Sequence, residues 1–190
     1  CLLGAAMASI GLRQDSNWDL QNYHLYNAWA FVHDRYGIDW APAQLQSFYS
    51  PSLDLPFYAL FAADVRPRWI AVALALPTGI AWFAFVQLTL LLFAPVAMPV
   101  RRYAIAAALV IGITAPMSIS LIGLTMNDWY VAAFVMVAVL VVVRGLVHSP
   151  LSTRALLVAG SLVGLAAGLK LTGAIYGVGL IGGLLAVSDP

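Results

Sequence analysis

The feature that most constrains this chain is a succession of long apolar segments after residue 68, with hardly a charged residue inside them. Four such segments, separated by short polar breaks, run from about 69–96, 103–126, 129–143 and 155–187. A helix on the surface of a water-soluble globule needs a polar face, and these segments have none. We therefore expect lipid to cover them and expect membrane helices there.

Composition supports the same fold class. Hydrophobic residues make up 63% of the 190 positions and charged residues 9%, whereas a soluble domain carries roughly 25% charged residues. The net charge of +1 argues against a nucleic-acid partner, which would require clustered Lys and Arg. The single cysteine, Cys1, excludes an internal disulfide and a Cys-rich metal site.

The two ends of the chain and its last apolar segment define the expected domain organisation. Residues 1–12 are too few to cross a bilayer and are expected to be the end of a longer first span. Segment 155–187 is too long for one span, and Lys170-Leu171-Thr172-Gly173 divides it into two helices of about 15 residues. We expect a single transmembrane domain, 1–190, within a longer protein. After the outer loop at 13–68 it would have about five further membrane helices over 69–187.

The arginines predict which side of the membrane each break faces. Short cytoplasmic loops are enriched in Lys and Arg, and the breaks that must share one side contain Arg101, Arg102, Arg144 and Arg154. Loop 13–68, Asn127-Asp128 and Lys170 then face outward. The loop also contains four Arg, so the rule holds on balance. Arg-over-Lys usage and abundant Ala and Val favour a bacterial inner (plasma) membrane, with the active site toward the periplasm or exterior.

The outer loop is rich in aromatic residues, which disordered segments lack. Helical spacing over 22–36 predicts an amphipathic surface helix that Gly37 ends. Pro42 suits the start of a second helix at 43–49, and 55–63 is a third apolar stretch too short to span. The sequence thus predicts an all-α fold, a multi-pass transmembrane bundle with an amphipathic-helix loop on its non-cytoplasmic face.

Two acids at the start of this loop are the candidate catalytic residues. If the segment is helical, Asp15 and Asp19 lie on one face, where their repulsion raises the pKa of one of them, which suits a general base. The alternatives are two solvated loop acids, or Asp15 as a helix N-cap. No Glu occurs in the chain, and the only other candidate bases are His24, His33 and His148.

Two further polar positions stand between apolar segments. Lys170 is the only lysine, and a charge at such a position often marks a functional site, although it also suits snorkelling toward the headgroups. An outward-facing ammonium there could meet a lipid phosphate. Asn127 and Asp128 lie at an outer turn, where an N-cap for the following helix is the simpler interpretation.

Taken together, these motifs resemble the GT-C fold membrane glycosyltransferases that use dolichol- or polyprenyl-phosphate sugars. Asp19 follows the first span four residues before Tyr23, a loop of surface helices comes next, and Asn127-Asp128 lies at an outer turn. The stretch from Gly164 to Gly173, with Lys170-Leu171-Thr172, is similar to the Leu/Thr/Lys turns of that superfamily. The chain departs from it in having Asp19-Leu20 and Lys170-Leu171 where those members have paired acids and Lys-Pro or Lys-Gly. Asp15 and Asp19 with Asn22-Tyr23-His24 and Ala41-Pro42-Ala43-Gln44-Leu45-Gln46 also resemble uncharacterised bacterial membrane proteins of the superfamily.

The resemblance implies transfer of a sugar from a polyprenyl-phosphate donor to a glycan, lipid or protein acceptor in the cell envelope. Asp19 or Asp15 would deprotonate the acceptor hydroxyl. The chain offers no dedicated metal cage, and a divalent cation (Mg or Mn) between carboxylates and phosphate is left open. The residues that would bind the substrate or the lipid phosphate are Lys170, His24, Tyr23, Asn127, Asp128 and Arg35.

Two other function classes remain open at this point. In a multi-pass transporter or channel subunit, Asp128 and Lys170 would line a pathway, although transporters place such groups near the midplane on broken helices and here the acids gather in one surface loop. A non-catalytic scaffold subunit is the third interpretation. A repeat of this half in the full-length protein would favour transport, and a soluble outer domain would favour the transferase.

Overall fold

A computed structural model describes residues 1–12, 15–148 and 151–188 of the chain. Across these residues every regular element is helical and none is a strand. The α-helices are α1 (Leu2–Gly11), α2 (Leu25–Val32), α3 (Leu55–Ala62), α4 (Pro67–Leu74), α5 (Leu76–Leu92), α6 (Val100–Thr114), α7 (Pro116–Ser120), α8 (Asp128–His148), α9 (Thr153–Leu169) and α10 (Ala174–Ser188). A π-helical turn, η1 (Leu20–His24), and three 3₁₀ turns, η2 (Gln44–Phe48), η3 (Pro51–Leu53) and η4 (Leu171–Gly173), complete the set.

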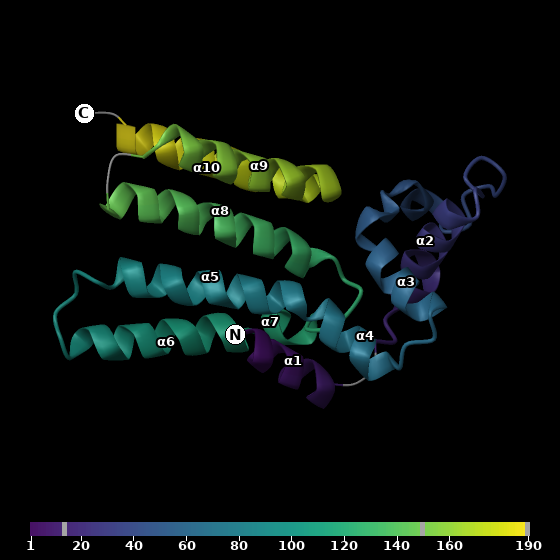
Figure 1. Ribbon diagram of the computed structural model, residues 1–190, viewed down its shortest axis with the longest axis horizontal. Coiled ribbons are helices and arrows are strands. Elements are labelled where there is room, and N and C mark those ends of the chain that lie inside the picture. The colour runs from purple at the N-terminus through teal and green to yellow at the C-terminus, as the bar shows by residue number, and fades with distance from the viewer. Residues whose placement is uncertain (13–14, 149–150, 189–190) are drawn as a thin grey trace.

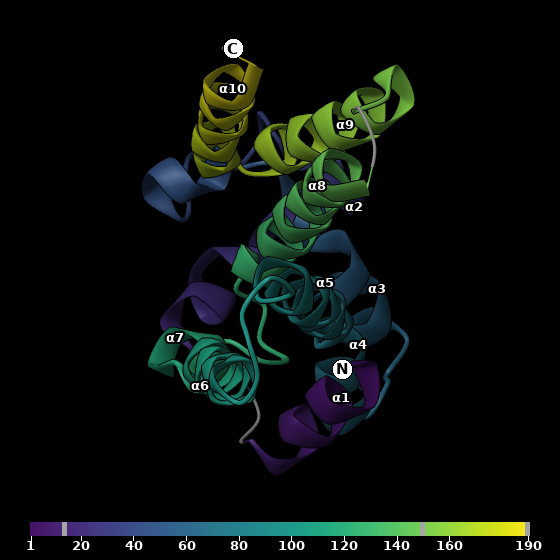
Figure 2. The ribbon, with the colours of Figure 1, turned by 90° about the vertical axis from the view of Figure 1, so that its left-hand side faces the viewer.

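The molecule divides into a layer of long helices and a cluster of short ones. Helices α5, α6, α8, α9 and α10 run side by side, and α2, α3 and the neighbouring turns gather at one end of them (Figure 1). Seen along the helices, α8 lies between α5 and α9 (Figure 2), with which it makes its most extensive contacts. The short helices therefore form a cap over one end of the helical layer.

Small side chains allow the long helices to pack closely. Ala84 of α5, Ala138 of α8, and Ala159 and Ala166 of α9 are at most 1% exposed and lie in the clusters that join these helices. Small residues at such contacts let helix backbones approach each other closely, which strengthens the van der Waals packing between them.

The outward faces of the long helices are as apolar as their contacts. On α6, Tyr103, Val110 and Ile111 are each more than 60% exposed, and Ile175 and Val178 on α10 are each 71% exposed. Two helical runs reach the length and hydropathy of a membrane span, Pro67–Leu92 (α4 with α5) and Asp128–His148. The buried core helix of a soluble protein can meet the same criteria, and the helices at Leu2–Gly11, Thr153–Leu169 and Leu171–Val187 are apolar but shorter.

The expected segments 129–143 and 155–187 correspond closely to the observed helices. Helix α8 covers the first of these segments, and α9 and α10 divide the second at Lys170–Gly173, as predicted. Gly173 is required at this break because a Cβ there would lie 2.7 Å from the backbone oxygen of Ala166. Ser152 caps α9 by accepting a hydrogen bond from the backbone N–H of Ala155.

The expected span at 103–126 is wrong in its second half. Helix α6 ends at Thr114, the backbone at Ala115 is extended, and Pro116 begins the separate short helix α7. The cause is steric, since proline disfavours the helical conformation in the residue before it and supplies no N–H to the preceding turn. Residues 121–127 then form turns that return to the cap.

Two of the expected surface helices also differ from the prediction. The first is helical from Trp18 and ends at Val32 rather than at Gly37, because Asp34 already adopts a left-handed conformation with φ of 52°. The second is only the 3₁₀ turn η2, whereas the third corresponds to α3. The cap is therefore shorter and more irregular than helical periodicity predicts.

Candidate functional site

A cavity of about 570 Å³ lies where the cap meets the helical layer. Four separate segments line it: the end of η1, the stretch around η2 and η3, the turn before α8, and the break between α9 and α10. Of the substrate-binding residues expected from the sequence, four line this cavity: Tyr23, His24, Asn127 and Lys170. A larger cavity of about 650 Å³ between α8 and α10 is lined almost entirely by aliphatic side chains and offers few groups for chemistry.

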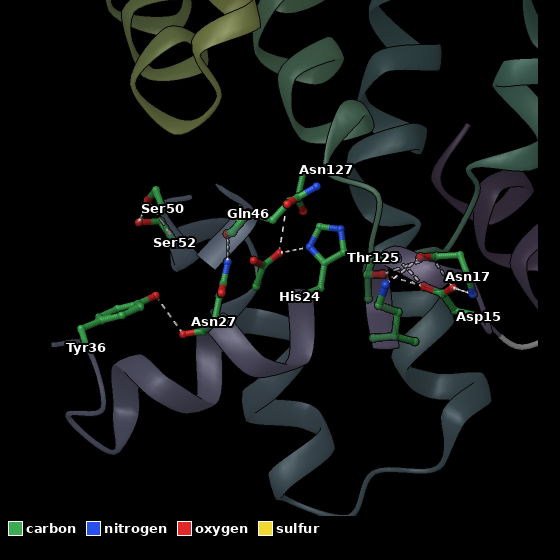
Figure 3. Close-up of polar contacts among 12 residues, drawn as sticks. Asp15, Asn17, His24, Asn27, Tyr36, Gln46, Ser50, Ser52, Thr125 and Asn127 are labelled. Atoms are coloured by element: carbon green, nitrogen blue, oxygen red, sulfur yellow. Dashed lines mark hydrogen bonds and ion pairs between the residues drawn. The ribbon is translucent and has the colours of Figure 1, made fainter. Parts of the chain in front are cut away.

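The centre of the cavity wall is a buried His–Asp pair. His24 Nδ1 lies 2.7 Å from Asp54 Oδ1, and each residue is only 3% exposed. The Asn127 side-chain amide donates a second hydrogen bond, of 2.9 Å, to the same oxygen (Figure 3). A carboxylate only accepts hydrogen bonds, so the His24 proton on this side is carried by Nδ1. One oxygen of Asp54 is thus fixed by two donors from distant segments.

The other atoms of this pair are left for further partners. Across the described residues, none donates a hydrogen bond to Asp54 Oδ2, and His24 Nε2 is buried without a partner. Asp54 precedes the first turn of α3, where the helix dipole favours a negative charge. His24 closes the π-helical turn, a geometry that often occurs at functional sites because it moves one side chain out of the regular helical register.

Tyr23 extends the polar wall from the pair toward the cap. Its ring lies 4.2 Å from that of His24 and meets the ring of Tyr49 edge-on at 5.8 Å, both measured between centroids. Burial, and then the negative charges of Asp19 and Asp54, raise the pKa of Tyr23 well above its ordinary value. The phenol therefore keeps its proton and is available as a hydrogen-bond donor.

Lys170 and Asp128 form an ion pair at the edge of the same cavity. Lys170 Nζ lies 2.8 Å from Asp128 Oδ1, with the two side chains 36% and 49% exposed. Lys170 has extended backbone between α9 and η4, and Asp128 is the first residue of α8. Because exposed ion pairs contribute little stability, this ammonium can exchange its partner for another anion at small cost.

Asp15 has a structural role that the sequence did not reveal. Its carboxylate accepts hydrogen bonds from the backbone N–H and the hydroxyl of Thr125, at 2.7 and 2.8 Å, and from the backbone and side chain of Asn17 (Figure 3). Thr125 is 2% exposed. Asp15 thereby joins the start of the cap to the turn before α8, and it lies outside the cavity.

The expected shared helical face of Asp15 and Asp19 does not form. Asn17 accepts a hydrogen bond from the backbone N–H of Leu20 at 2.7 Å, in the manner of an N-cap, and the helix begins at Trp18. Asp15 therefore lies before the helix. Asp19 lies in its first turn, where its charge contributes to the raised pKa of Tyr23 one turn later.

Arg35 belongs to a separate group in the cap. Its guanidinium donates to both carboxylate oxygens of Asp39, at 3.1 Å from Nε and 2.5 Å from Nη2, and the Tyr26 hydroxyl donates to Asp39 at 2.9 Å. The hydrogen bond from Arg35, which has the larger effect, and the hydrogen bond from Tyr26 hold the pKa of Asp39 below its ordinary value. The structure thus does not bring Arg35 to the cavity with the other expected binding residues.

Asp54 is the site residue that sequence reasoning missed. In the sequence it reads as an ordinary turn acid before an apolar stretch, 30 positions from His24 and 73 from Asn127. Within the described ranges, no three His, Cys, Asp or Glu side chains come together in a way that could hold a metal ion.

No family model, curated protein or solved structure matches this chain.

Proposed function

We propose that this protein is a membrane glycosyltransferase that moves a sugar from a polyprenyl-phosphate donor to an extracytoplasmic acceptor, with Asp54 as general base. The observation that carries the proposal is the buried Asp54 carboxylate at the cavity wall, with one oxygen held by His24 and Asn127. Lys170 at the edge of the same cavity supplies a cation for the donor phosphate.

The setting of the cavity supports a lipid-linked donor. It lies at one end of a layer of apolar helices whose outward faces are also apolar. The end of α5 with the start of α6, and the end of α8 with the start of α9, lie at the opposite end of the layer (Figure 1). Near these helix ends the sequence has Arg101, Arg102, Arg144 and Arg154. By the positive-inside rule that opposite end is cytoplasmic. The cavity then opens at the outer membrane surface of a multi-pass bundle, where the headgroup of a polyprenyl-phosphate sugar resides.

The reaction balances with the groups present. Asp54 Oδ2 accepts the proton of the acceptor hydroxyl while the hydroxyl oxygen forms a bond to the anomeric carbon of the donor sugar. The bond between that carbon and the phosphate oxygen breaks, and its electron pair leaves with the polyprenyl phosphate. His24 and Asn127 keep the carboxylate in place during the transfer, which is the contribution expected of positioning residues.

Lys170 has the complementary role at the leaving group. The departing phosphate gains negative charge as the glycosidic bond breaks, and a cation already in place stabilises that charge. In the structure Lys170 is paired with Asp128, which keeps the ammonium at the cavity edge before the donor binds. The Tyr23 phenol, which keeps its proton, can donate a hydrogen bond to either substrate.

The test is sugar transfer from labelled polyprenyl-phosphate sugars in membranes that contain the full-length protein, wild type against Asp54→Asn. Removing a general base is expected to lower kcat about 10²- to 10⁴-fold. Lys170→Met is expected to weaken use of the donor, whereas Asp64→Asn, at an exposed loop position away from this cavity, serves as the matched acid control.

The outcomes separate the competing assignments. If Asp54→Asn retains wild-type transfer while Asp19→Asn loses it, Asp19 is the base and the role given to Asp54 is wrong. If the wild type transfers no sugar from any of several donors, the transferase proposal fails and transport becomes the leading interpretation. Thermal melting of each variant shows whether loss of transfer reflects chemistry or unfolding.

A further inference from the structure

A second cavity, of about 420 Å³, lies in the cap beside the candidate active site. The two cavities share the wall formed by Phe48, Tyr49 and Ser50. The remainder of the second cavity includes Tyr26, Tyr36 and Asp39, and we call it the cap cavity. A molecule bound there would lie next to the wall that leads to Asp54.

Two aromatic rings of the cap cavity, those of Tyr36 and Tyr49, are held in place while parts of them remain open. The Tyr36 hydroxyl donates to the backbone oxygen of the fully buried Asn27 at 3.1 Å, and the Tyr49 ring contacts Tyr23 edge-on. Tyr36, Tyr49 and Phe48 are nevertheless 41%, 48% and 74% exposed. Rings fixed in this way lose little conformational freedom when a ligand packs on them.

Asp39 supplies a fixed hydrogen-bond acceptor in the same cavity. Arg35 and Tyr26 hold its carboxylate, and they keep the pKa of Asp39 below its usual range. A carboxylate has about four acceptor positions, and three of them are used by these contacts. One position is therefore left for a ligand hydroxyl, and the net charge of the Arg35–Asp39 pair is zero.

Aromatic faces combined with a fixed acceptor fit one class of ligand best. A sugar ring has apolar C–H faces that pack on aromatic rings, and it has hydroxyls at its rim that donate to a carboxylate. We propose that the cap cavity binds a carbohydrate acceptor, with its ring against Tyr36 and Phe48 and its reacting hydroxyl directed past Tyr49 toward Asp54. This inference rests on the proposed function and specifies its acceptor as a glycan rather than a lipid or a protein.

The test measures binding of methyl glycosides to the full-length protein in nanodiscs. Saturation-transfer NMR monitors this binding, and no polyprenyl-phosphate sugar donor is present. A panel of methyl glycosides of common hexoses, N-acetylhexosamines and pentofuranoses serves as the probe. At least one is expected to bind to the wild type, and Tyr36→Ala and Phe48→Ala are each expected to weaken its binding about tenfold. Leu45→Ala is the matched control, because Leu45 lies in η2 with Phe48 but outside the cap cavity, and this variant is expected to leave binding unchanged.

One further variant, together with Phe48→Ala, separates ring packing from folding. Tyr36→Phe keeps the ring and loses only the hydrogen bond to Asn27, so it is expected to retain more binding than Tyr36→Ala. The Phe48 side chain has no polar atom, so Phe48→Ala tests the contribution of the ring to binding without removing a side-chain hydrogen bond. Absence of binding by every glycoside, or equal binding by wild type, Tyr36→Ala and Phe48→Ala, overturns the inference.

Failure of this inference can be distinguished from failure of the proposed function. Binding is measured without donor, so it does not require transfer, and Asp54→Asn should bind the glycoside although its transfer activity is strongly lowered. If glycosides bind in a manner that depends on Tyr36 and Phe48 but no sugar is ever transferred, the carbohydrate site stands and the transferase proposal falls. If sugar is transferred with an unchanged acceptor KM in Tyr36→Ala and Phe48→Ala, the transferase stands and the cap cavity is not its acceptor site.

Discussion

At the scale of single residues, Asp15 and Asp54 are two acids of the same loop with opposite surroundings. The hydrogen bonds to Asp15 engage both of its oxygens and come from two loop segments. Asp54 has its two donors on one oxygen and is one of the residues that line the cavity. A saturated carboxylate holds segments together, whereas one with an open oxygen is able to accept a proton from a substrate.

Asp15→Ala is therefore expected to destabilise the fold rather than to remove a catalytic group. It leaves Thr125, which is buried, without its charged acceptor, and the expected loss of stability is about 2–3 kcal/mol. Unfolding of the variant in detergent micelles measures this loss. Asp19→Ala is the control, because no hydrogen bond to its side chain occurs in the described part of the chain, and its change should stay within about 0.5 kcal/mol.

Transfer activity per folded molecule gives the second measurement for Asp15. We expect Asp15→Ala protein that has folded to retain most of its transfer activity. A folded, thermally normal Asp15→Ala protein that transfers no sugar would instead identify Asp15 as the base, and the structural role argued above would be wrong.

At the scale of elements, the turn from α2 to η2 depends on charge for its shape. Arg35 and Asp39 are four residues apart in the segment between α2 and η2. Asp34 and Ala41 in this segment, and Gln44 at the start of η2, have left-handed conformations. Left-handed backbone in residues other than glycine is unfavourable, and it persists where surrounding contacts determine it. The contacts of Asp39 with Arg35 and Tyr26 supply such a restraint.

The Asp39 contacts predict a pH dependence with a definite sign. The folded pKa of Asp39 is lowered from 3.8, so its contribution to stability is fully present above about pH 4 and is lost as pH falls through the lower folded pKa. The thermal midpoint of the wild type should exceed that of Asp39→Asn at pH 7, and this difference should shrink below pH 3.8. Other titrating groups are common to both proteins and cancel in the difference. A difference that is constant from pH 7 to pH 2.5 would contradict this account.

At the scale of the whole molecule, one arrangement would account for both the apolar outer surface and the separation of the two ends of the helical layer. The cap, the turn before α8 and the break between α9 and α10 lie at one end (Figure 1). The end of α5, the start of α6, the end of α8 and the start of α9 lie at the other. A bilayer around the helices would satisfy their exposed apolar faces and place these two ends in different compartments.

Cysteine labelling tests this arrangement directly. In a Cys1→Ala background, Ser52→Cys places a thiol at an exposed position of the cap, and Val100→Cys places one at the exposed start of α6. With a membrane-impermeant maleimide, Ser52→Cys should be labelled in intact cells, and Val100→Cys only after the cells are lysed. Equal labelling of both variants in intact cells would contradict the membrane arrangement. Labelling of Val100→Cys alone would show that the protein has the opposite orientation in the membrane.

The sequence by itself determined the local features of this protein, and the tertiary structure decided the site. The apolar run lengths and the Lys170–Gly173 interruption act on the backbone nearby, so the all-helical class, α8 and the division between α9 and α10 could be predicted. Pro116 also acts locally, but the expected span at 103–126 ran through it, whereas α6 ends at Thr114. Asp54, His24 and Asn127 meet only because α3, η1 and the turn before α8 pack together, and no local pattern encodes a contact across 30 or 73 residues. For the same reason the sequence does not distinguish Asp15 from Asp19, because Thr125, which donates to Asp15, lies 110 residues along the chain.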